Sequence, residues 1–308
     1  MNIVFMGTPS FALPILDMLY QEHHVMLVVT QPDKVVGRKK VITPSPIKER
    51  AQALNLEVFQ PAELKKDYQK IIDLNPDLIV TAAYGQMLPK ALLDHITAIN
   101  VHGSLLPQYR GGAPIQYALF DGLKQTGVTI MFMAYAMDSG DIIKQEALDI
   151  APDDDYQSLS QKLSHLGSRL LSDVLNSYPH VTRIKQNGEE ATYAYTLKYE
   201  DEIISFSMTS EKLINKIRGL SPEPGATLLH QKSTIKVYGA KKSDIIDSKA
   251  VPGMILSAKK KLIIQAKDGA IEITKLQLPG KRIMMANDFL NGQNIFAEGD
   301  VLIEGSLK

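Results

Sequence analysis

One short stretch, NVHGSLLPQYRGGAPIQ at residues 100–116, holds side chains that could do chemistry. Asn100 and His102 are two residues apart at the end of an apolar run, so in an extended strand both side chains would lie on one face. An amide N–H and an imidazole N–H that converge there would form a donor pair for a developing oxyanion. The alternative is that both side chains only end a strand and bond to the next turn. These residues alone favour that simpler interpretation.

A second polar segment makes a catalytic role for Asn100 and His102 more plausible. MDSGD, at residues 137–141, follows the apolar run GVTIMFMA, so its carboxylates are expected at the carboxyl end of a strand. A carboxylate there could orient His102 or collect a proton from an attacking amine. A plain Asp-Ser-Gly turn between two antiparallel strands is the alternative. An amide, an imidazole and a carboxylate without a nucleophilic Ser or Cys favour direct transfer between two bound substrates over an acyl-enzyme route.

Several other chemistries lack their sequence signatures. The chain has no cysteine, which excludes disulfides, thiolate zinc sites and cysteine nucleophiles. GTPSFA follows the first strand-like run in place of a dinucleotide-binding glycine fingerprint, and no P-loop motif occurs. The GxSxG motif of serine hydrolases is absent, and the histidines form no cluster with metal-ligand spacing. We therefore predict neither a metal ion nor a nucleotide cofactor.

The elements that must position these residues alternate between strand-like and helix-like runs. The strand-like runs are NIVFMG, VMLVVTQ, LEVFQP, PDLIVTAAYG, AINVHG, GVTIMFMA and IIKQEALDI. The helix-like runs between them are TPSFALPILDMLYQE, with Thr8 as its cap, SPIKERAQALN and LKKDYQKIIDLN. This alternation predicts an α/β fold with a Rossmann-like, doubly wound and mostly parallel sheet. Ligands of such sheets bind beyond the carboxyl ends of the strands, where residues 100–102 are expected.

The second half of the chain has a different pattern. SLSQKLSHLGSRLLSDVLNSY predicts a long amphipathic helix that closes a domain spanning residues 1–185. Residues 186–206 are polar without a clear period, which predicts a linker. From residue 207 one helix, SEKLINKIRGL, precedes short β-like runs broken by Gly, Pro and Lys. This pattern predicts a small, OB-like β-barrel over residues 207–308.

Composition excludes several classes of protein. Hydrophobic residues make up 44% of the chain and charged residues 22%, which is typical of a globular protein. No apolar run is long enough to cross a membrane, and the N-terminal residues lack the pattern of a signal peptide. We therefore expect a cytoplasmic protein with no membrane partner.

The formal net charge of zero hides an asymmetry. Residues 1–206 carry 18 Lys and Arg against 24 Asp and Glu, a net of −6, and residues 207–308 carry 16 against 10, a net of +6. A basic second half suggests contact with a polyanion, although short domains also differ by several charges without such a role. DKVVGRKK at residues 33–40 adds a basic cluster, for which a solvated loop is the default interpretation.

Together these segments resemble a known family. NVHGSLLPQYRGGAPIQ is similar to the folate signature of the 10-formyltetrahydrofolate-dependent formyltransferases. Other segments of the chain resemble the branch of this family that acts on methionyl-tRNA. They are FMGTPSFA, QPDKVVGRKK, PDLIVTAAYGQMLP, TGVTIMFM, MDSGD, IRGLSPEPGA and LQLPGKRIMMANDFLNG. The resemblance covers essentially the whole chain. Several formyltransferases share the Asn-x-His and SLLP core, which indicates the chemistry, whereas the basic loop and the C-terminal segments indicate the acceptor.

The resemblance implies formyl transfer from 10-formyltetrahydrofolate, a co-substrate, to the amine of initiator methionyl-tRNA by a monomer without a metal. It makes Asn100, His102 and Asp138 the catalytic set. Asn100 and protonated His102 would hold the oxyanion, while Asp138 would hold His102 and help to move the proton to the departing folate nitrogen. Asp141 is expected to be structural.

The resemblance also implies binding residues. The folate-binding turn is matched by Ser104, Leu105, Leu106 and Pro107. Arg38 matches an arginine that recognises the acceptor end of initiator tRNA, with Lys39 and Lys40 as phosphate contacts. The tRNA body would be held by the barrel lysines at positions 232, 236, 241, 242 and 259–261. The chain departs from the family at Glu223, where an aromatic residue is frequent, and it has no tryptophan, which leaves the packing at the domain junction open.

Rival interpretations stay open at this stage. A formyltransferase for a small amine, such as an amino sugar or glycinamide ribonucleotide, would share Asn100, His102 and Asp138 but would not need a basic barrel. An RNA-binding protein that has lost catalysis would not need the triplet, and the intact triplet argues against it. A Rossmann dehydrogenase is disfavoured because the glycine fingerprint is missing.

Overall fold

The structure is a computed structural model that describes residues 1–308 except 37–39, 231–232, 246, 248, 293–294 and 303–308. The chain forms two compact units. Unit 1 comprises Met1–Pro114, Gln125–Asp149 and Ser160–Tyr195, and unit 2 comprises Ile115–Lys124, Ile150–Leu159 and Thr196–Lys308. Unit 2 therefore includes two segments from the first half of the chain as well as the C-terminal part.

Unit 1 is built on a seven-stranded sheet with the order β5-β2-β1-β6-β7-β8-β9. Its strands are β1 (Asn2–Gly7), β2 (His24–Val29), β5 (Val58–Phe59), β6 (Leu78–Ala82), β7 (Ala98–His102), β8 (Gln125–Phe132) and β9 (Ile142–Asp149). The first five strands in spatial order are parallel, whereas β8 and β9 are antiparallel to their neighbours. The predicted mostly parallel, doubly wound sheet is confirmed.

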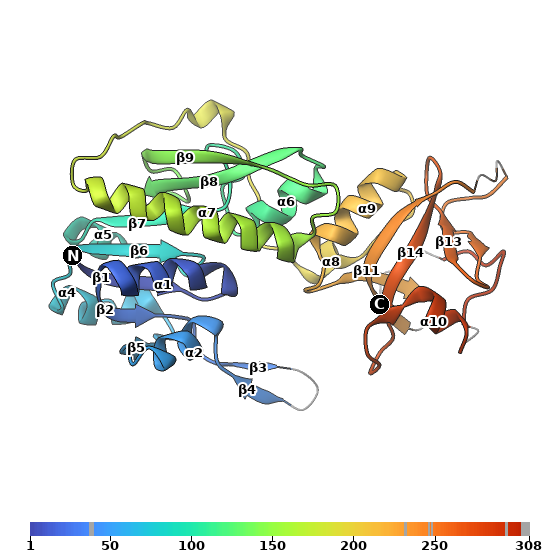
Figure 1. Cartoon of the computed structure of the whole chain (residues 1–308), viewed down its shortest axis with the longest axis horizontal. Coiled ribbons are helices and arrows are strands. Elements are labelled where there is room, and N and C mark those ends of the chain that lie inside the picture. The colour runs from blue at the N-terminus through green and yellow to red at the C-terminus, as the bar shows by residue number, and fades with distance from the viewer. Residues whose placement is uncertain (37–39, 231–232, 246, 248, 293–294, 303–308) are drawn as a thin grey trace. The chain divides into compact units, whose positions relative to one another are not determined.

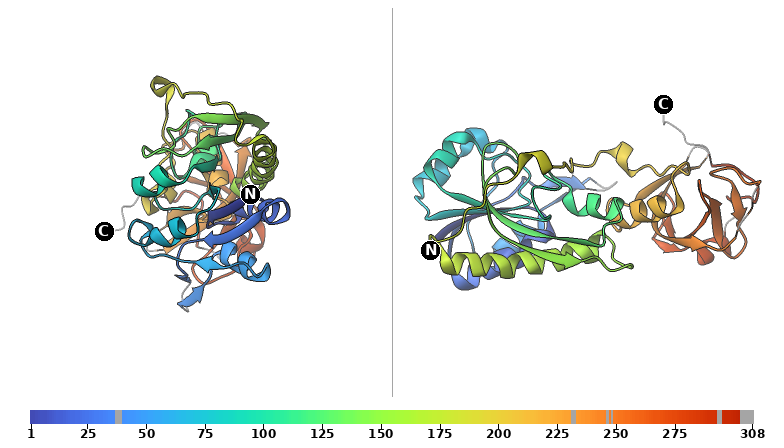
Figure 2. Two further views of the ribbon diagram at one scale, coloured as in Figure 1. Left: turned by 90° about the vertical axis from the view of Figure 1, so that its left-hand side faces the viewer. Right: turned by 90° about the horizontal axis from the view of Figure 1, so that it is seen from above.

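Helices pack on both faces of this sheet (Figure 1, Figure 2). They are α1 (Leu13–Glu22), α2 (Pro46–Ala53), α3 (Leu64–Asp67), α4 (Gln69–Asp73), α5 (Lys90–His95) and α7 (Tyr156–Ser177). A Cβ on Gly167 would lie 2.7 Å from Val101 Cγ1, so this glycine lets α7 pack directly on β7. Ala98 belongs instead to the core beneath α3, α4 and α5. Because side chains alternate along a strand, Asn100 and His102 point to the same face as Ala98.

The helix after β1 begins later than predicted. A 3-10 turn at Ser10–Ala12 comes first, and α1 begins at Leu13 with Pro14 in its first turn. Proline is tolerated there because the first N–H groups of a helix have no partner within it. Thr8 does not cap this helix, and its Oγ1 donates to the Tyr84 carbonyl at 2.8 Å. This bond ties together the loops that follow β1 and β6.

A β-hairpin that the sequence pattern did not predict extends from unit 1 (Figure 1). It consists of β3 (Lys34–Val36) and β4 (Val41–Thr43), and β4 is exposed throughout. Its base is fixed by Asp33, whose carboxylate accepts from Gln60 Nε2 at 2.8 Å and Lys48 Nζ at 2.6 Å. These two hydrogen bonds lower the pKa of Asp33. Within the predicted basic segment, residues 33–40, Lys34–Val36 form β3 and Lys40 directly precedes β4.

Unit 2 holds an antiparallel sheet with the order β10-β11-β14-β13-β12, and a further strand, β15, pairs with β14. The strands are β10 (Ala226–His230), β11 (Ser233–Ser243), β12 (Ile255–Ser257), β13 (Leu262–Gln265), β14 (Ala270–Gln277) and β15 (Met284–Met285). The C-terminal part of the unit also forms the helices α8 (Tyr199–Glu202), α9 (Ser210–Gly219) and α10 (Ala286–Leu290). The sheet curls into a half-barrel, in agreement with the short strands that the sequence predicted.

The core of unit 2 includes chain from the first half of the sequence. Phe120, the last residue of α6 (Pro114–Phe120), packs against this core. A Cβ on Gly219 would lie 2.6 Å from Phe120 Cε1, so glycine makes room for the ring. A fragment that ends near residue 190 would therefore lack the core on which Phe120 packs, and single substitutions in the full chain are the cleaner tests of each unit.

Candidate active site

The Asn100 amide is oriented by a neighbouring strand. Asn100 in β7 and Thr81 in β6 are cross-strand partners, and Thr81 Oγ1 donates to Asn100 Oδ1 at 2.7 Å. Because the hydroxyl engages the amide oxygen, the Nδ2 group points elsewhere, and it makes no hydrogen bond to any residue that the structure describes. Asn100 is half-buried. The amide therefore has fixed donors available to a bound substrate, as an oxyanion donor requires.

His102 joins two loops of the site. It is buried, and its Nε2 lies 3.0 Å from the Tyr109 carbonyl oxygen. A carbonyl oxygen only accepts, so Nε2 carries the hydrogen of this bond. Nδ1 faces Asp138 Oδ2 at 3.7 Å. His102 thus makes a bond to the next turn, as the simpler interpretation of the strand end expected, and it also approaches the Asp138 carboxylate.

Asp138 reaches His102 by a route that the sequence did not indicate. MDSGD does follow the carboxyl end of a strand, but β8 is antiparallel to β7, so that end lies beside the start of β7. The loop must fold back across the sheet to bring the carboxylate to His102. Asp138 has φ 47°, a left-handed conformation that Asp and Asn adopt more readily than most residues. The Gly111 N–H donates to Asp138 Oδ2 at 2.8 Å and fixes the carboxylate.

Gln186 clamps this loop from the segment predicted to be a linker. Its Nε2 donates to the carbonyl oxygens of Asp138 at 2.8 Å and Gly140 at 2.7 Å. Its Oε1 accepts from Arg110, at 3.1 Å from Nε and 2.7 Å from Nη2. Both Gln186 and Arg110 are buried. One amide therefore satisfies the buried guanidinium and positions the backbone that carries Asp138.

The SLLP turn is held from β8. Thr129 Oγ1 donates to the Ser104 carbonyl at 2.6 Å and accepts from the Leu106 N–H at 3.1 Å. Ser104 and Leu106 are buried, whereas Leu105 and Pro107 are half-buried. Of the four residues predicted to bind folate, only Leu105 and Pro107 present side-chain surface.

The residues predicted to contact tRNA are spread over both units. Arg38 and Lys39 lie outside the described residues, as does Lys232, and Lys40 is exposed at the start of β4. Lys236 is engaged within unit 2, where its Nζ contacts Glu202 Oε2 at 2.6 Å. The remaining lysines of the predicted basic surface are exposed: Lys241, Lys242, Lys259, Lys260 and Lys261.

The described part of the chain lacks a metal-binding cluster and a membrane-spanning helix. It contains no group of three or more His, Cys, Asp or Glu residues that could hold a metal ion. None of its helices has the length and apolar character needed to cross a membrane.

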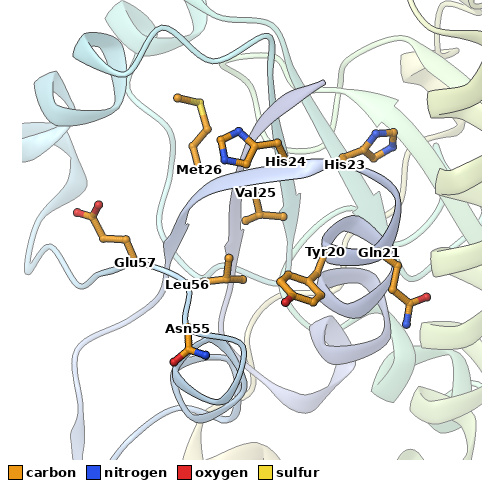
Figure 3. A pocket seen from close by; sticks show the side chains of 9 residues that line it. All are labelled: Tyr20, Gln21, His23, His24, Val25, Met26, Asn55, Leu56 and Glu57. Carbon is orange, nitrogen blue, oxygen red and sulfur yellow. The ribbon is translucent and has the colours of Figure 1, made fainter.

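A separate hollow lies at the other end of unit 1. Tyr20, His23, His24, Asn55 and Glu57 are among the residues that line it (Figure 3). His24 is the first residue of β2, so the hollow is at the amino end of the parallel strands. It is therefore distinct from the site around the carboxyl end of β7.

Comparison with known proteins shows the family to which the chain belongs. The family model described as Formyl transferase matches residues 1–175, and the model described as Formyl transferase, C-terminal domain, matches residues 196–294. A methionyl-tRNA formyltransferase from Macrococcus caseolyticus is 46% identical over 298 residues, which cover 94% of this chain and 95% of that protein. This chain belongs to the methionyl-tRNA formyltransferase family.

Solved structures share the fold of this formyltransferase. Methionyl-tRNA formyltransferase from Clostridium thermocellum superposes with a TM-score of 0.57 at 21% identity, over 79% of this chain and 94% of that chain. HypX from Aquifex aeolicus, solved in complex with tetrahydrofolic acid, gives a TM-score of 0.64 at 16% identity, over 94% of this chain and 46% of that chain. The enzyme thus spans just under half the length of HypX.

Three residues around the site of this enzyme were missed by sequence reasoning. Thr81 is the single polar residue of LIVTA, and a lone hydroxyl beside a strand end could have marked it. Arg110 stands between a tyrosine and two glycines, and nothing in that spacing identifies its partner. Gln186 carries no local signal, because its contacts lie 46, 48 and 76 residues away along the chain.

We expect Gln186→Leu to lower both activity and stability. The substitution leaves the Arg110 guanidinium and the carbonyls of Asp138 and Gly140 buried without their partner, which costs about 1–3 kcal/mol in the free energy of unfolding. Urea unfolding measures that loss, and kcat measures the misplacement of Asp138. Gln186→Glu is the matched variant, since it keeps an acceptor for Arg110 but removes both N–H donors. Unchanged kcat in Gln186→Glu would contradict a positioning role.

Proposed function

We propose that this enzyme transfers the formyl group of 10-formyltetrahydrofolate to the amino group of methionine on initiator methionyl-tRNA. The observation that carries the proposal is the Asn100 amide, whose oxygen is held by Thr81 while its nitrogen is left to a substrate. The family to which the chain belongs supports the acceptor. Because that acceptor is a charged tRNA for translation initiation, we place the reaction in the cytoplasm.

The reaction forms one bond and breaks one. The methionyl nitrogen attacks the formyl carbon, the bond from that carbon to the folate nitrogen breaks, and one proton moves from the amine to the folate nitrogen. Negative charge develops on the formyl oxygen during the attack, and Asn100 Nδ2 would donate to it. His102 can donate there as well only if its Nε2–H leaves the Tyr109 carbonyl. Asn100 is therefore the donor that is ready before the substrates bind.

The Asp138 carboxylate and the His102 imidazole are the groups that would handle the proton lost by the attacking amine. Asp138 Oδ2 and His102 Nδ1 face each other at 3.7 Å, so the carboxylate would favour the protonated imidazole by its charge. Either group would be a candidate to accept the proton of the attacking amine. Leu105 and Pro107 are the side chains of the SLLP turn with surface left to receive the apolar part of the donor. The donor enters as a co-substrate, and none of these roles uses a metal ion.

A formylation assay tests the proposal directly. Radiolabelled formyl transfer from 10-formyltetrahydrofolate is measured with methionyl initiator tRNA, methionyl elongator tRNA and a nucleotide-linked amino sugar. We expect product on the initiator tRNA, far less on the elongator tRNA and none on the sugar. Formylation of the sugar in place of either tRNA would overturn the acceptor while leaving the transfer chemistry intact.

The basic residues between β3 and β4 in the sequence supply a prediction about tRNA choice. Arg38→Ala is expected to lower kcat/KM on initiator tRNA by about 1–3 kcal/mol, the usual worth of one specific base contact, and to reduce discrimination against elongator tRNA. Lys39→Ala and Lys40→Ala should weaken both tRNAs about equally and reduce the salt dependence, as phosphate contacts do. The measurement is kcat/KM for both tRNAs at two salt concentrations.

Lys34→Ala is the control, since Lys34 is an exposed lysine at the base of the same hairpin. It should leave the ratio of initiator to elongator activity unchanged. If Arg38→Ala also left that ratio unchanged, Arg38 would have no part in recognising the initiator tRNA.

A further inference from the structure

Two tyrosines lie exposed on the segment that pairs with the glycine-rich loop of the site. Tyr193 is 48% exposed and Tyr195 is 61% exposed. Their ring planes are parallel within 6°, and the ring centroids are 5.8 Å apart. Ala194 between them is fully buried, as alternation in an extended segment requires. The two stacked rings thus form one exposed aromatic surface, and aromatic side chains of this kind are enriched at binding sites.

The tyrosine pair is fixed to the backbone that holds the catalytic groups. The Arg110 N–H donates to the Thr192 carbonyl at 2.8 Å, and the Ala194 N–H donates to the Arg110 carbonyl at 2.8 Å. A Cβ on Gly111 would lie 2.4 Å from the Ala194 carbonyl oxygen, so only glycine permits this approach. The same Gly111 donates its N–H to Asp138. The segment that carries the two tyrosines is therefore bonded to the same loop that positions Asp138.

We infer that Tyr193 and Tyr195 form a stacking surface for the unpaired bases at the 3′ end of the acceptor RNA. This inference rests on the proposed function, because an amine esterified to that end must reach Asn100 and the nucleotides beside it are unpaired. Every base has a flat face, and exposed aromatic side chains bind single strands by stacking on it. The SLLP turn offers the apolar surface proposed for the donor, which leaves the tyrosine pair for the acceptor.

Kinetics of paired substitutions test the inference in the full chain. The double variant Tyr193→Leu and Tyr195→Leu keeps apolar volume but removes both rings. Its kcat/KM for initiator methionyl-tRNA should fall by roughly 5- to 100-fold, mainly through KM, with the KM of the formyl donor unchanged. The matched double variant with Phe at both positions keeps the rings and should behave as the wild type. Wild-type kinetics in the Leu variant, or a change in donor KM alone, would overturn the inference.

Binding is measured without catalysis by fluorescence. The chain has no tryptophan, so Tyr195→Trp places a single tryptophan at the surface. An oligoribonucleotide ending in an unpaired CCA should quench its emission, and a blunt-ended RNA duplex should not. Tyr20→Trp is the control, because Tyr20 is 45% exposed in the separate hollow of Figure 3 and should respond to neither RNA.

The two experiments separate this inference from the proposed function. Quenching by the single strand in an enzyme that formylates no tRNA would refute the proposed function and support the stacking surface. Normal formylation by the Leu variant without quenching of Tyr195→Trp would refute the stacking surface alone. Equal quenching by the blunt duplex would mean that charge and not stacking holds the RNA, and quenching by the folate donor alone would assign the pair to the donor. Both of these results overturn the inference.

Discussion

Asn100→Asp is expected to reduce kcat by ~10²–10³-fold or more, the loss that follows removal of one oxyanion donor. The variant keeps the shape of the side chain and still accepts from Thr81 Oγ1, as Asn100 Oδ1 does at 2.7 Å. In place of the amide N–H groups it presents a second oxygen to a substrate oxygen that is gaining negative charge. Asn100→Ala should lose the donor without adding repulsion. Single-turnover formylation at saturating donor and tRNA measures both variants, and the dissociation constant of the donor should change little.

Thr81→Val is the companion variant that separates the presence of the donor from its orientation. Removing the hydroxyl leaves the Asn100 amide in place but free to rotate, so we expect a smaller loss, about 0.5–1.5 kcal/mol, the usual net worth of one hydrogen bond. Rates ordered wild type, Thr81→Val, Asn100→Ala would support an oriented donor. Near wild-type kcat in Asn100→Asp would show that this amide does not stabilise the reaction.

The elements of the fold with strong periodicity could be predicted from the sequence. The strands β1, β2, β6 and β7 are short apolar runs, and α7 has a clear amphipathic pattern, so local composition determines what they become. The β3–β4 hairpin could not be predicted because its residues lack alternation between buried and exposed positions. The inclusion of Phe120 in the core of unit 2 is a tertiary contact with no local signature.

Some residues of the candidate site could likewise be predicted from the sequence, and others could not. Asn100 and His102 could be predicted because two residues on one strand share a face by geometry alone. The meeting of His102 with Asp138 depends on the loop after β8 folding back, because β8 is antiparallel to β7 and ends beside its start. The apolar run GVTIMFMA specifies neither the strand direction nor the path of this loop. Gln186 could not be found because a single glutamine in a polar segment resembles any other until the chain is folded. Spacing thus predicts the two candidate donors, whereas the groups that orient them could be found only in the structure.

Asp138→Asn is expected to lower kcat by ~10²–10⁴-fold, the range attributed to a positioned acid or base. The substitution isolates the charge, because asparagine also tolerates the left-handed backbone at φ 47° and its Oδ1 can still accept from the Gly111 N–H. The amide cannot take a proton from the attacking amine, and it no longer faces His102 Nδ1 with a negative charge. The pH dependence of kcat should therefore lose the limb that reports the acceptor of the proton, while thermal unfolding should show a Tm close to that of the wild type.

Asp141→Asn is the matched control within the same MDSGD segment. Asp141 is placed by its backbone, since its carbonyl accepts from the Phe132 N–H at 2.9 Å, a bond that the substitution retains. We expect its kcat and pH dependence to match the wild type. If Asp138→Asn kept its rate while Asp141→Asn lost it, the Asp141 carboxylate would be the proton acceptor. The 3.7 Å approach of Asp138 to His102 would then be only a structural contact. Asp138→Ala completes the series: it removes the charge and also the preference for the left-handed backbone, so only this variant should lower the Tm together with kcat.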